Sequence, residues 1–487
     1  MKCLVLFILM FSPFLVHSQD SFEVILASDD DETIYKGLQH PSGSYFLTGR
    51  KGMDLHTSSP YIIKISACGD VQDKTIIRED TNGFFPTFEF LNNGNILLIG
   101  QCKLQDTLTR FDHLWLCEID TNLNIINEKT YFMLKDDYYE YWNWYSLLDQ
   151  TGNIVLAGNY IYYPGHHDLV YLKVNQNCDT VLSKSYHYQF GQVAGQIFNQ
   201  PDTSYLSVVE RINPSQPLSL VELDTNLTII NITPTTLEYN FFQGYTITWI
   251  DSNVSLHSAS RYDYSSETRS IGVVLADSNY QIQKEVIFDR PDTVDYPAIH
   301  SSHCYIDDST IYVLGYQSYS DFYMLTPSVI FLYLLDKDLN VLGNLDLGGD
   351  VNYKMWGVAA TNDGGCLIYG TIYDNPDGIP EYDIYIRKLI REEIVITTEV
   401  RDMISTTSTV KIFPLPSQNI INVQMPCSVE ESCCSIFEIS GRLVYKKRFQ
   451  ENGNLISIDI RNLKKGAYVI TLLFPDHREF STKFIKN

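Results

Sequence analysis

The sequence has few basic residues and only one long apolar run, at its start. In 487 residues, 35 Lys and Arg stand against 59 Asp and Glu, which gives a formal charge of -24. A surface this acidic repels phosphate backbones, so nucleic acid is not expected as a partner. No later stretch is long and apolar enough to span a bilayer, and we expect no transmembrane segment.

Known catalytic and metal-binding motifs are also missing. The chain has no Gly-x-Ser-x-Gly elbow, no His-Glu-x-x-His and no phosphate-binding loop. Its ten cysteines form no Cys-x-x-Cys pair suited to zinc or redox chemistry. We therefore predict no catalytic residues, no metal and no cofactor. The cysteines in strand-like runs are interpreted as buried apolar thiols, namely Cys102, Cys117, Cys304 and Cys366.

Two acidic segments resemble the start of a calcium-binding loop. They begin at Asp120 and Asp336, but each lacks Gly at the sixth position and Glu at the twelfth. We interpret both as Asx turns, in which the carboxylate accepts backbone hydrogen bonds a few residues on.

Residues 1–18 have the layout of a secretory signal peptide. Lys2 precedes an apolar run from Leu4 to Val16, and short residues follow at the two positions that a signal peptidase reads. The run is shorter than the ~20 residues that span a bilayer, and Pro13 interrupts it. Cleavage is predicted after Ser18, followed by export of the mature protein.

The sequence does contain a repeat of about fifty residues. A turn followed by a short apolar strand occurs seven times, in segments 43–49, 94–100, 152–158, 203–209, 252–258, 309–315 and 364–370. A second strand motif follows each one, in segments 60–66, 113–120, 168–175, 218–224, 270–277, 329–336 and 382–389. Further strand-like runs precede and follow these two. Val, Ile, Tyr and Thr dominate the runs, and no window shows helical periodicity.

Four short strands in each of seven repeats predict an all-β fold, with a seven-bladed β-propeller over residues 20–396. The seventh repeat has only three strands of its own. Residues 22–28 could supply the fourth strand and so join the two ends of the ring. Residues 391–399 compete for the same place, and the sequence leaves both alternatives open.

The repeats resemble the Asp-Gly-Gly-centred β-propeller repeats that are common in secreted bacterial proteins. The seventh repeat matches best, with Asn362-Asp363-Gly364-Gly365 followed by Gly370. The fourth and fifth repeats lack both turn glycines. This resemblance implies a fold rather than a particular activity.

The composition changes after residue 396. Residues 397–409 are rich in Ser and Thr and are predicted to be a linker. Positions 411–487 carry 11 Lys and Arg against 7 Asp and Glu, whereas positions 19–410 carry 23 against 52. This break predicts a separate domain over 410–487, and its alternating apolar and polar residues predict a small β-sandwich.

The tail resembles the C-terminal sorting domain of the bacterial type IX (Por) secretion system. The matching motifs are a Pro-x-Pro turn, a Gly turn, a Gly-Ala-Tyr segment and a near-terminal Lys, at Pro414, Pro416, Gly441, Gly466, Tyr468 and Lys486. Leu415 departs from the family, which usually has Asn there. The resemblance implies a bacterium of the Bacteroidetes type and the type IX machinery as a partner. It also implies passage through the periplasm to the cell surface or the medium.

The loops between predicted blades are rich in aromatic residues beside acidic ones. In a propeller these loops lie on one face, around the central tunnel. Aromatic rings next to carboxylates suit the faces and hydroxyls of sugars, or a peptide. A competing interpretation is that the rings cap the cores of adjacent blades. The candidate ligand-binding residues are Tyr138, Tyr139, Trp142, Tyr296 and Trp356.

The sequence therefore favours an exported, non-catalytic binding or scaffold module. The alternative is a glycan-active hydrolase or lyase with its site on the same face, and a third possibility is a purely structural surface protein. A cluster of carboxylates at the tunnel mouth would favour the enzyme, whereas an aromatic face would favour binding.

Overall fold

The structure is a computed structural model of the chain, which describes residues 21–394 and 411–486 with gaps. The gaps lie at 29, 53–57, 79–81, 104–112, 132–137, 163–165, 188–192, 203, 214–215, 235–240, 264–267, 291–293, 318–326, 375–380, 414–416, 418, 430–431, 439–442, 450–452 and 474–478. In some strand ends, such as residues 138–143, only the backbone is described. The predicted signal peptide and linker lie outside the described residues.

The described chain is all-β, as predicted. Residues 22–394, here called the seven-sheet region, contain seven antiparallel sheets. Sheet 1 has β2 (Glu32–Gln39), β3 (Tyr45–Lys51), β4 (Ser59–Ile65) and β5 (Val71–Ile76). Sheet 2 has β6 (Asn82–Phe90), β7 (Ile96–Lys103), β8 (His113–Ile119) and β9 (Ile125–Tyr131). Sheet 3 has β10 (Tyr138–Leu148), β11 (Ile154–Tyr162), β12 (His166–Val174) and β13 (Thr180–Tyr186).

The remaining four sheets follow the same order along the chain. Sheet 4 has β14 (Val193–Asn199), β15 (Tyr205–Asn213), β16 (Gln216–Leu223) and β17 (Ile229–Pro234). Sheet 5 has β18 (Phe241–Trp249), β19 (Val254–Asp263), β20 (Thr268–Asp277) and β21 (Ile282–Phe288). Sheet 6 has β22 (Asp295–Pro297), β23 (His303–Asp307), β24 (Thr310–Gln317), β25 (Val329–Leu335) and β26 (Val341–Gly348). Sheet 7 has β27 (Asn352–Ala360), β28 (Cys366–Asp374), β29 (Glu381–Leu389) and β1 (Phe22–Leu26).

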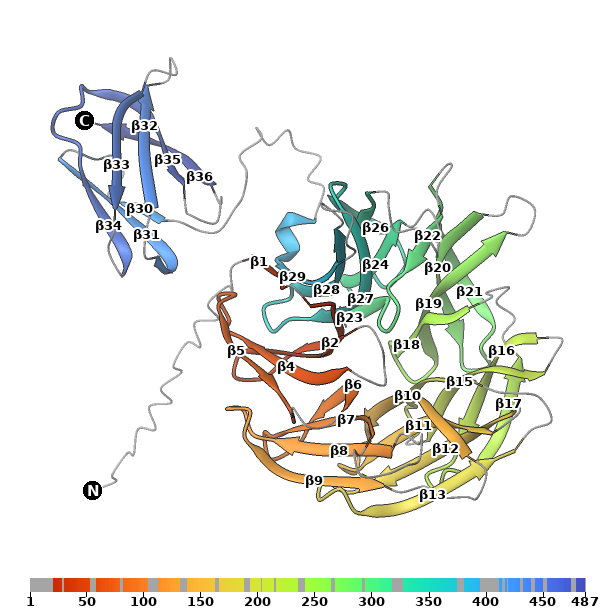
Figure 1. Ribbon diagram of the computed structural model, residues 1–487. Coiled ribbons are helices and arrows are strands. Elements are labelled where there is room, and N and C mark those ends of the chain that lie inside the picture. The colour runs from red at the N-terminus through yellow and green to blue at the C-terminus, as the bar shows by residue number, and fades with distance from the viewer. Residues whose placement is uncertain are drawn as a thin grey trace, which may run out of the picture.

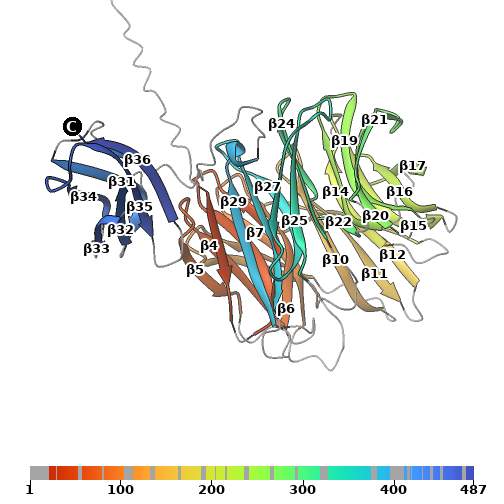
Figure 2. The ribbon, with the colours of Figure 1, turned by 90° about the horizontal axis from the view of Figure 1, so that it is seen from above.

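The sheets surround a common centre, as Figure 1 shows. The first strands of consecutive sheets contact one another in chain order, from β2 and β6 through to β23 and β27, and β27 in turn contacts β2. The outer strands, among them β5, β9 and β13, lie far from this centre (Figure 1). Figure 2 shows the strands of neighbouring sheets running side by side. This arrangement places the first strand of every sheet where a central site would form.

The N-terminal strand β1 completes sheet 7. It pairs with β29 in antiparallel register from Phe22 opposite Lys388 to Leu26 opposite Ile384. The alternative strand at 391–399 is wrong where the structure describes it, because residues Arg391–Glu393 form the short 3-10 helix η1. The two ends of the seven-sheet region are therefore held in one sheet.

Sheet 6 departs from the expected four strands. Its inner strand is divided into β22 and β23, both of which pair with β24. Ala298 and Ser302 still hydrogen-bond to Leu314 of β24. Residues 299–301 between them bond to sheet 7 instead: Ile299 N–H donates to the Met355 carbonyl (3.1 Å) and Val358 N–H donates to the Ser301 carbonyl (3.0 Å). The interruption adds a strand and projects a short segment towards the centre.

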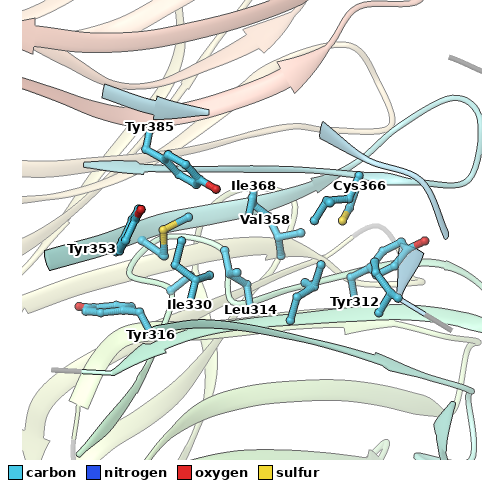
Figure 3. Packing of buried hydrophobic residues seen from close by; sticks show 14 of the residues in the cluster. Tyr312, Leu314, Tyr316, Ile330, Tyr353, Val358, Cys366, Ile368 and Tyr385 are labelled. Atoms are coloured by element: carbon cyan, nitrogen blue, oxygen red, sulfur yellow. The ribbon is translucent and has the colours of Figure 1, made fainter. Parts of the chain in front are cut away.

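The apolar core lies between adjacent sheets, so the middle strands bury both faces. Tyr45 and Leu47 of β3 pack towards sheet 7, whereas Phe46 between them packs towards sheet 2. This two-sided burial explains why the motif strands are continuous apolar runs rather than alternating ones. Figure 3 shows one such core, in which side chains of sheet 6 face side chains of sheet 7, among them Leu314, Ile330, Val358, Ile368 and Tyr385.

The acidic segments form Asx turns, which confirms that interpretation. The Asp120 carboxylate accepts the backbone N–H of Asn122 (2.8 Å) and of Asn124 (2.9 Å). Asp336 binds the corresponding backbone groups in the same way. The predicted thiols Cys102, Cys117 and Cys366 are buried, whereas Cys304 is only half-buried.

Residues 411–486, here called the tail, contain two more antiparallel sheets. One has β30 (Lys411–Phe413), β31 (Ile420–Val429) and β34 (Gly453–Asp459). The other has β33 (Leu443–Phe449), β32 (Ser432–Glu438), β35 (Gly466–Leu473) and β36 (Glu479–Lys486). Side chains of both sheets share one core, among them Ile421, Val423, Ile436, Ile458, Ile470 and Phe484.

Candidate functional site

A cavity of about 460 Å³ lies at the centre of the seven-sheet region. The inner strand of every sheet contributes to its lining, with Leu38, Thr87, Ser146, Phe198, Thr248, Tyr305 and Ala360 as one residue from each. Of these, Ala360 is exposed to solvent. A concave site of this size, built from several elements, is the usual form of a small-molecule site.

One wall of the cavity carries an ion pair. The Lys36 ammonium lies 3.0 Å from Oε1 of Glu89 and donates to the Thr87 hydroxyl at 3.1 Å. The Ser146 hydroxyl donates to the same Glu89 oxygen at 2.6 Å. Lys36 comes from sheet 1, Thr87 and Glu89 from sheet 2, and Ser146 from sheet 3. This wall, here called the ion-pair wall, is polar but carries no net charge.

The wall formed by sheets 5 and 6 carries hydroxyls and a histidine. His303 lies with Nδ1 2.6 Å from the Ser258 hydroxyl and Nε2 3.0 Å from the Thr248 hydroxyl. Burial, with a smaller contribution from the neighbouring His257, lowers the pKa of His303 to about 3. The imidazole is therefore neutral near physiological pH and is held between two hydroxyls.

The projecting segment of sheet 6 places His300 among aromatic rings. The His300 ring centroid lies 5.0 Å from that of Trp356, 6.0 Å from that of Tyr35 and 6.2 Å from that of Tyr145. Its backbone carbonyl accepts a hydrogen bond from the Gln196 side chain of sheet 4. Burial lowers the pKa of His300 to about 4. A neutral imidazole thus joins an aromatic cluster that reaches across the centre from sheet 6 to sheets 1, 3 and 7.

The prediction that the candidate ligand-binding residues lie in loops between blades is wrong, because they lie on the first strands β10, β22 and β27. Trp356 belongs to the cluster around His300, and its indole N–H donates to the Thr371 hydroxyl at 3.0 Å. Tyr296 stacks on Tyr316 with centroids 5.8 Å apart and is not among the residues that line the cavity. The side chains of Tyr138, Tyr139 and Trp142 lie outside the described residues.

The polar groups that line the cavity were not selected from the sequence. Lys36, Thr87, Ser146 and His303 each lie on the first strand of a repeat. The signal that could have found them is a polar residue at the inward position of such a strand, rather than an aromatic residue in a loop.

In the tail, the structure describes three of the six sorting-motif positions. Tyr468 is buried, stacks on Phe484 with centroids 5.5 Å apart, and donates its hydroxyl hydrogen to the Lys464 carbonyl at 2.8 Å. Gly466 and Lys486 are directly opposite each other on β35 and β36. Pro414, Pro416 and Gly441 lie outside the described residues. The described motif positions therefore organise the tail's own core and strand pairing.

The comparison with protein families matches residues 411–487 to the secretion system C-terminal sorting domain. This match indicates export by the type IX secretion system, to the cell surface or into the medium, and recognition by its machinery. In the described part of the chain no helix is long and apolar enough to cross a membrane. The described residues also contain no group of three His, Cys, Asp or Glu that could hold a metal ion.

No curated protein matches the sequence. Among solved structures, a protein of unknown function from Dyadobacter fermentans matches with 9% identity and a TM-score of 0.42 over 77% of this chain and 99% of its own. A fungal alcohol oxidase of the AA5 family matches with 11% identity and a TM-score of 0.45 over 97% of this chain and 100% of its own. A subtype N10 neuraminidase-like protein of A/little yellow-shouldered bat/Guatemala/060/2010 matches with 11% identity and a TM-score of 0.36 over 61% of this chain and 89% of its own. These likenesses are distant.

Proposed function

We propose that the protein is an exported, non-catalytic binding module: a seven-bladed β-propeller over residues 20–396, joined by a linker at 397–409 to a sorting domain at 410–487. Seven sheets in chain order, contacts between successive first strands and the pairing of β1 with β29 support a closed ring. The match of residues 411–487 to a sorting domain supports the role of the tail.

One observation carries the binding role, namely the central cavity lined by the inner strands of all seven sheets. Its lining combines hydroxyls, an ion pair and aromatic rings, such as Thr87, Lys36 and Phe198. These groups bind a ligand by hydrogen bonds and by contact with its apolar faces. A site that draws on every sheet also requires the whole ring, which gives the fold a direct part in the function.

Filling the cavity tests this proposal. Ala360 lines the cavity and is exposed, so Ala360→Phe adds a ring to the cavity with little demand on the core. Ala27 is also exposed but does not line the cavity, which makes Ala27→Phe the matched control.

The mature full-length protein would be screened by ligand-detected NMR against neutral and charged sugars and short peptides. We expect at least one class to bind to the wild type and to Ala27→Phe and to lose binding in Ala360→Phe. Binding that survives in Ala360→Phe, or no binding from any class, would contradict a binding role for the cavity. Turnover of a bound compound would instead identify an enzyme.

A further inference from the structure

We infer that the cavity binds a neutral, hydroxyl-rich ring of the size of a monosaccharide, and that the Lys36–Glu89 pair sets this preference for a neutral ligand. The inference rests on the proposed binding function and specifies its ligand. It draws on the charges, the hydrogen-bonding groups and the apolar surface of the cavity.

The charges of the cavity cancel within its own wall. Lys36 is the only Lys, Arg, Asp or Glu among the residues that line the cavity where the structure describes them, and Glu89 lies 3.0 Å from its ammonium. The side chains of both are largely shielded, with 22% and 14% exposed. A charged ligand would have to compete with one partner for the other and leave a shielded charge unpaired, which is costly. A neutral ligand does not disturb the pair.

The ion-pair wall offers hydrogen bonds suited to hydroxyl groups. The Lys36 ammonium has three N–H donors, and Glu89 and Thr87 take two of them. The hydroxyls of Thr87 and Ser146 lie 2.8 Å apart. Because Ser146 donates its one hydrogen to Glu89, Thr87 donates to Ser146, and each hydroxyl oxygen keeps one lone pair that can accept, beside the third N–H donor of Lys36. A set of adjacent donors and acceptors matches neighbouring hydroxyls on a sugar ring better than it matches a single amide or carboxylate.

Apolar groups line other parts of the same cavity. Leu38, Phe198 and Tyr305 come from sheets 1, 4 and 6 and are half-buried. A pyranose ring has one apolar face of C–H groups, and such a face packs on aliphatic and aromatic side chains. The volume of about 460 Å³ accommodates a single ring and leaves space for water.

The test compares three sugars that share a ring and differ in charge, namely glucose, glucuronate and glucosamine. Binding to the full-length mature protein would be measured by titration calorimetry near neutral pH. We expect glucose to bind about tenfold more tightly than either charged sugar, since each of them leaves one member of the pair uncompensated.

Removing either charge of the pair should abolish the preference for glucose. Each variant should then favour the sugar whose charge is opposite to the charge that remains. Lys36→Met leaves the Glu89 carboxylate alone and should favour glucosamine over glucose. Glu89→Gln leaves the Lys36 ammonium alone and should favour glucuronate over glucose. The double variant Lys36→Met/Glu89→Gln is neutral again and should restore the preference for glucose, which keeps the test valid if one single variant fails to fold.

A second pair of variants tests the hydroxyls. Thr87→Val keeps the shape of the side chain but removes its hydroxyl, and it should weaken glucose binding about tenfold. Thr75→Val makes the same change on β5, where Thr75 bonds to Asp73 at the surface, and it should leave binding unchanged.

Three outcomes would overturn the inference. If a peptide binds in a way that Ala360→Phe abolishes while no sugar binds, the ligand class is wrong but the binding function stands. If the charge preference stays the same in both single variants, the pair does not set it. If nothing binds to the cavity, the proposed function fails together with the inference.

Discussion

The two parts of the molecule differ in where their polar side chains lie. In the tail, the side chains that meet between the two sheets are largely aliphatic and aromatic, such as Ile421, Ile458 and Phe484. In the seven-sheet region the apolar cores lie between sheets, while an ion pair, hydroxyls and histidines gather at the centre. Two stacked sheets have a single interior, which apolar side chains fill. Sheets arranged around a centre have an apolar core between each pair of neighbours, so the inner strands are free to carry polar groups that face a central site.

Removing the tail, which separates the two parts of the molecule, should have the largest effect. Deletion of residues 411–487 should leave the seven-sheet region folded but trapped in the periplasm, because each part has its own core and the predicted signal peptide is kept. Cell fractionation and limited proteolysis of the truncated protein in a bacterium with the type IX system would measure both. Truncated protein in the medium or at the cell surface would contradict the sorting role of the tail.

Buried charge in the seven-sheet region gives the next largest effect. The Lys388 ammonium is fully buried and pairs with the Asp363 carboxylate of the Asp-Gly-Gly turn. Asp363→Asn leaves that ammonium uncompensated and should lower the free energy of unfolding by about 3–5 kcal/mol.

The double variant Asp363→Asn/Lys388→Met should recover most of this loss in urea unfolding. The exposed pair of Lys337 and Asp308 serves as a control, and Asp308→Asn should change little. An equal effect of the two Asp→Asn variants would show that burial does not strengthen the first pair.

The lowered pKa of Asp363 also predicts how the stability of the seven-sheet region depends on pH. Burial raises the pKa of Asp363, but its hydrogen bonds to Lys388 and Thr361 outweigh burial and hold the pKa below the ordinary value. Its contribution to stability is therefore present above the ordinary pKa of Asp and is lost as the pH falls through the lowered one. The stability of Asp363→Asn, measured by urea unfolding below pH ~4, should fall less steeply with acid than that of the wild type.

Two buried histidines, His257 and His303, should make the seven-sheet region sensitive to mild acid. Burial lowers the pKa of both His257 and His303 from 6.5 to about 3. As the pH falls below 6.5, the unfolded chain binds protons that the folded chain does not, so stability is lost between about 6.5 and about 3. His303→Gln should lose less stability over this range than the wild type, as measured by urea unfolding. An unchanged pH slope would contradict the lowered pKa.

The candidate aromatic residues of β10 should have the smallest effect. Replacing Tyr139 and Trp142 by Ala is predicted to weaken ligand capture by about 1 kcal/mol per ring and to leave the melting temperature nearly unchanged. The same change at Trp356 should lower the melting temperature, because its ring packs on His300 and Tyr35. Calorimetric binding and thermal unfolding separate the two effects, and a large drop in melting temperature for the first pair would show that those rings belong to the core.

Much of the fold could be predicted because the repeat leaves a periodic trace in the sequence. The turns and the apolar strands that are buried on both faces, such as residues 94–100, recur at similar spacing. The Asx turns at Asp120 and Asp336 could also be predicted, because their residue types are typical of such turns. The choice between 22–28 and 391–399 depended on strand pairing across the whole chain, which no local pattern specifies. The added strand of sheet 6 likewise depends on hydrogen bonds of residues 299–301 with sheet 7.

The cavity could not be predicted, because its residues are distant in the sequence. Lys36 and Ser146 both contact the Glu89 carboxylate, but only because sheets 1, 2 and 3 converge in the folded chain. Residues such as Lys36, Glu89 and Thr87 look like ordinary surface positions on short strands. Aromatic loops were more conspicuous in the sequence, yet of the two candidates with described side chains only Trp356 lies in the cluster beside the cavity.

The most direct test of a central binding site is a crystal structure of the mature protein soaked with glucose. The account predicts one sugar ring in the cavity, with a hydroxyl within hydrogen-bonding distance of Lys36 or Ser146 and the ring packed on Phe198 or Tyr305. Sugar bound only outside the cavity, or a cavity that holds only water at saturating glucose, would contradict it.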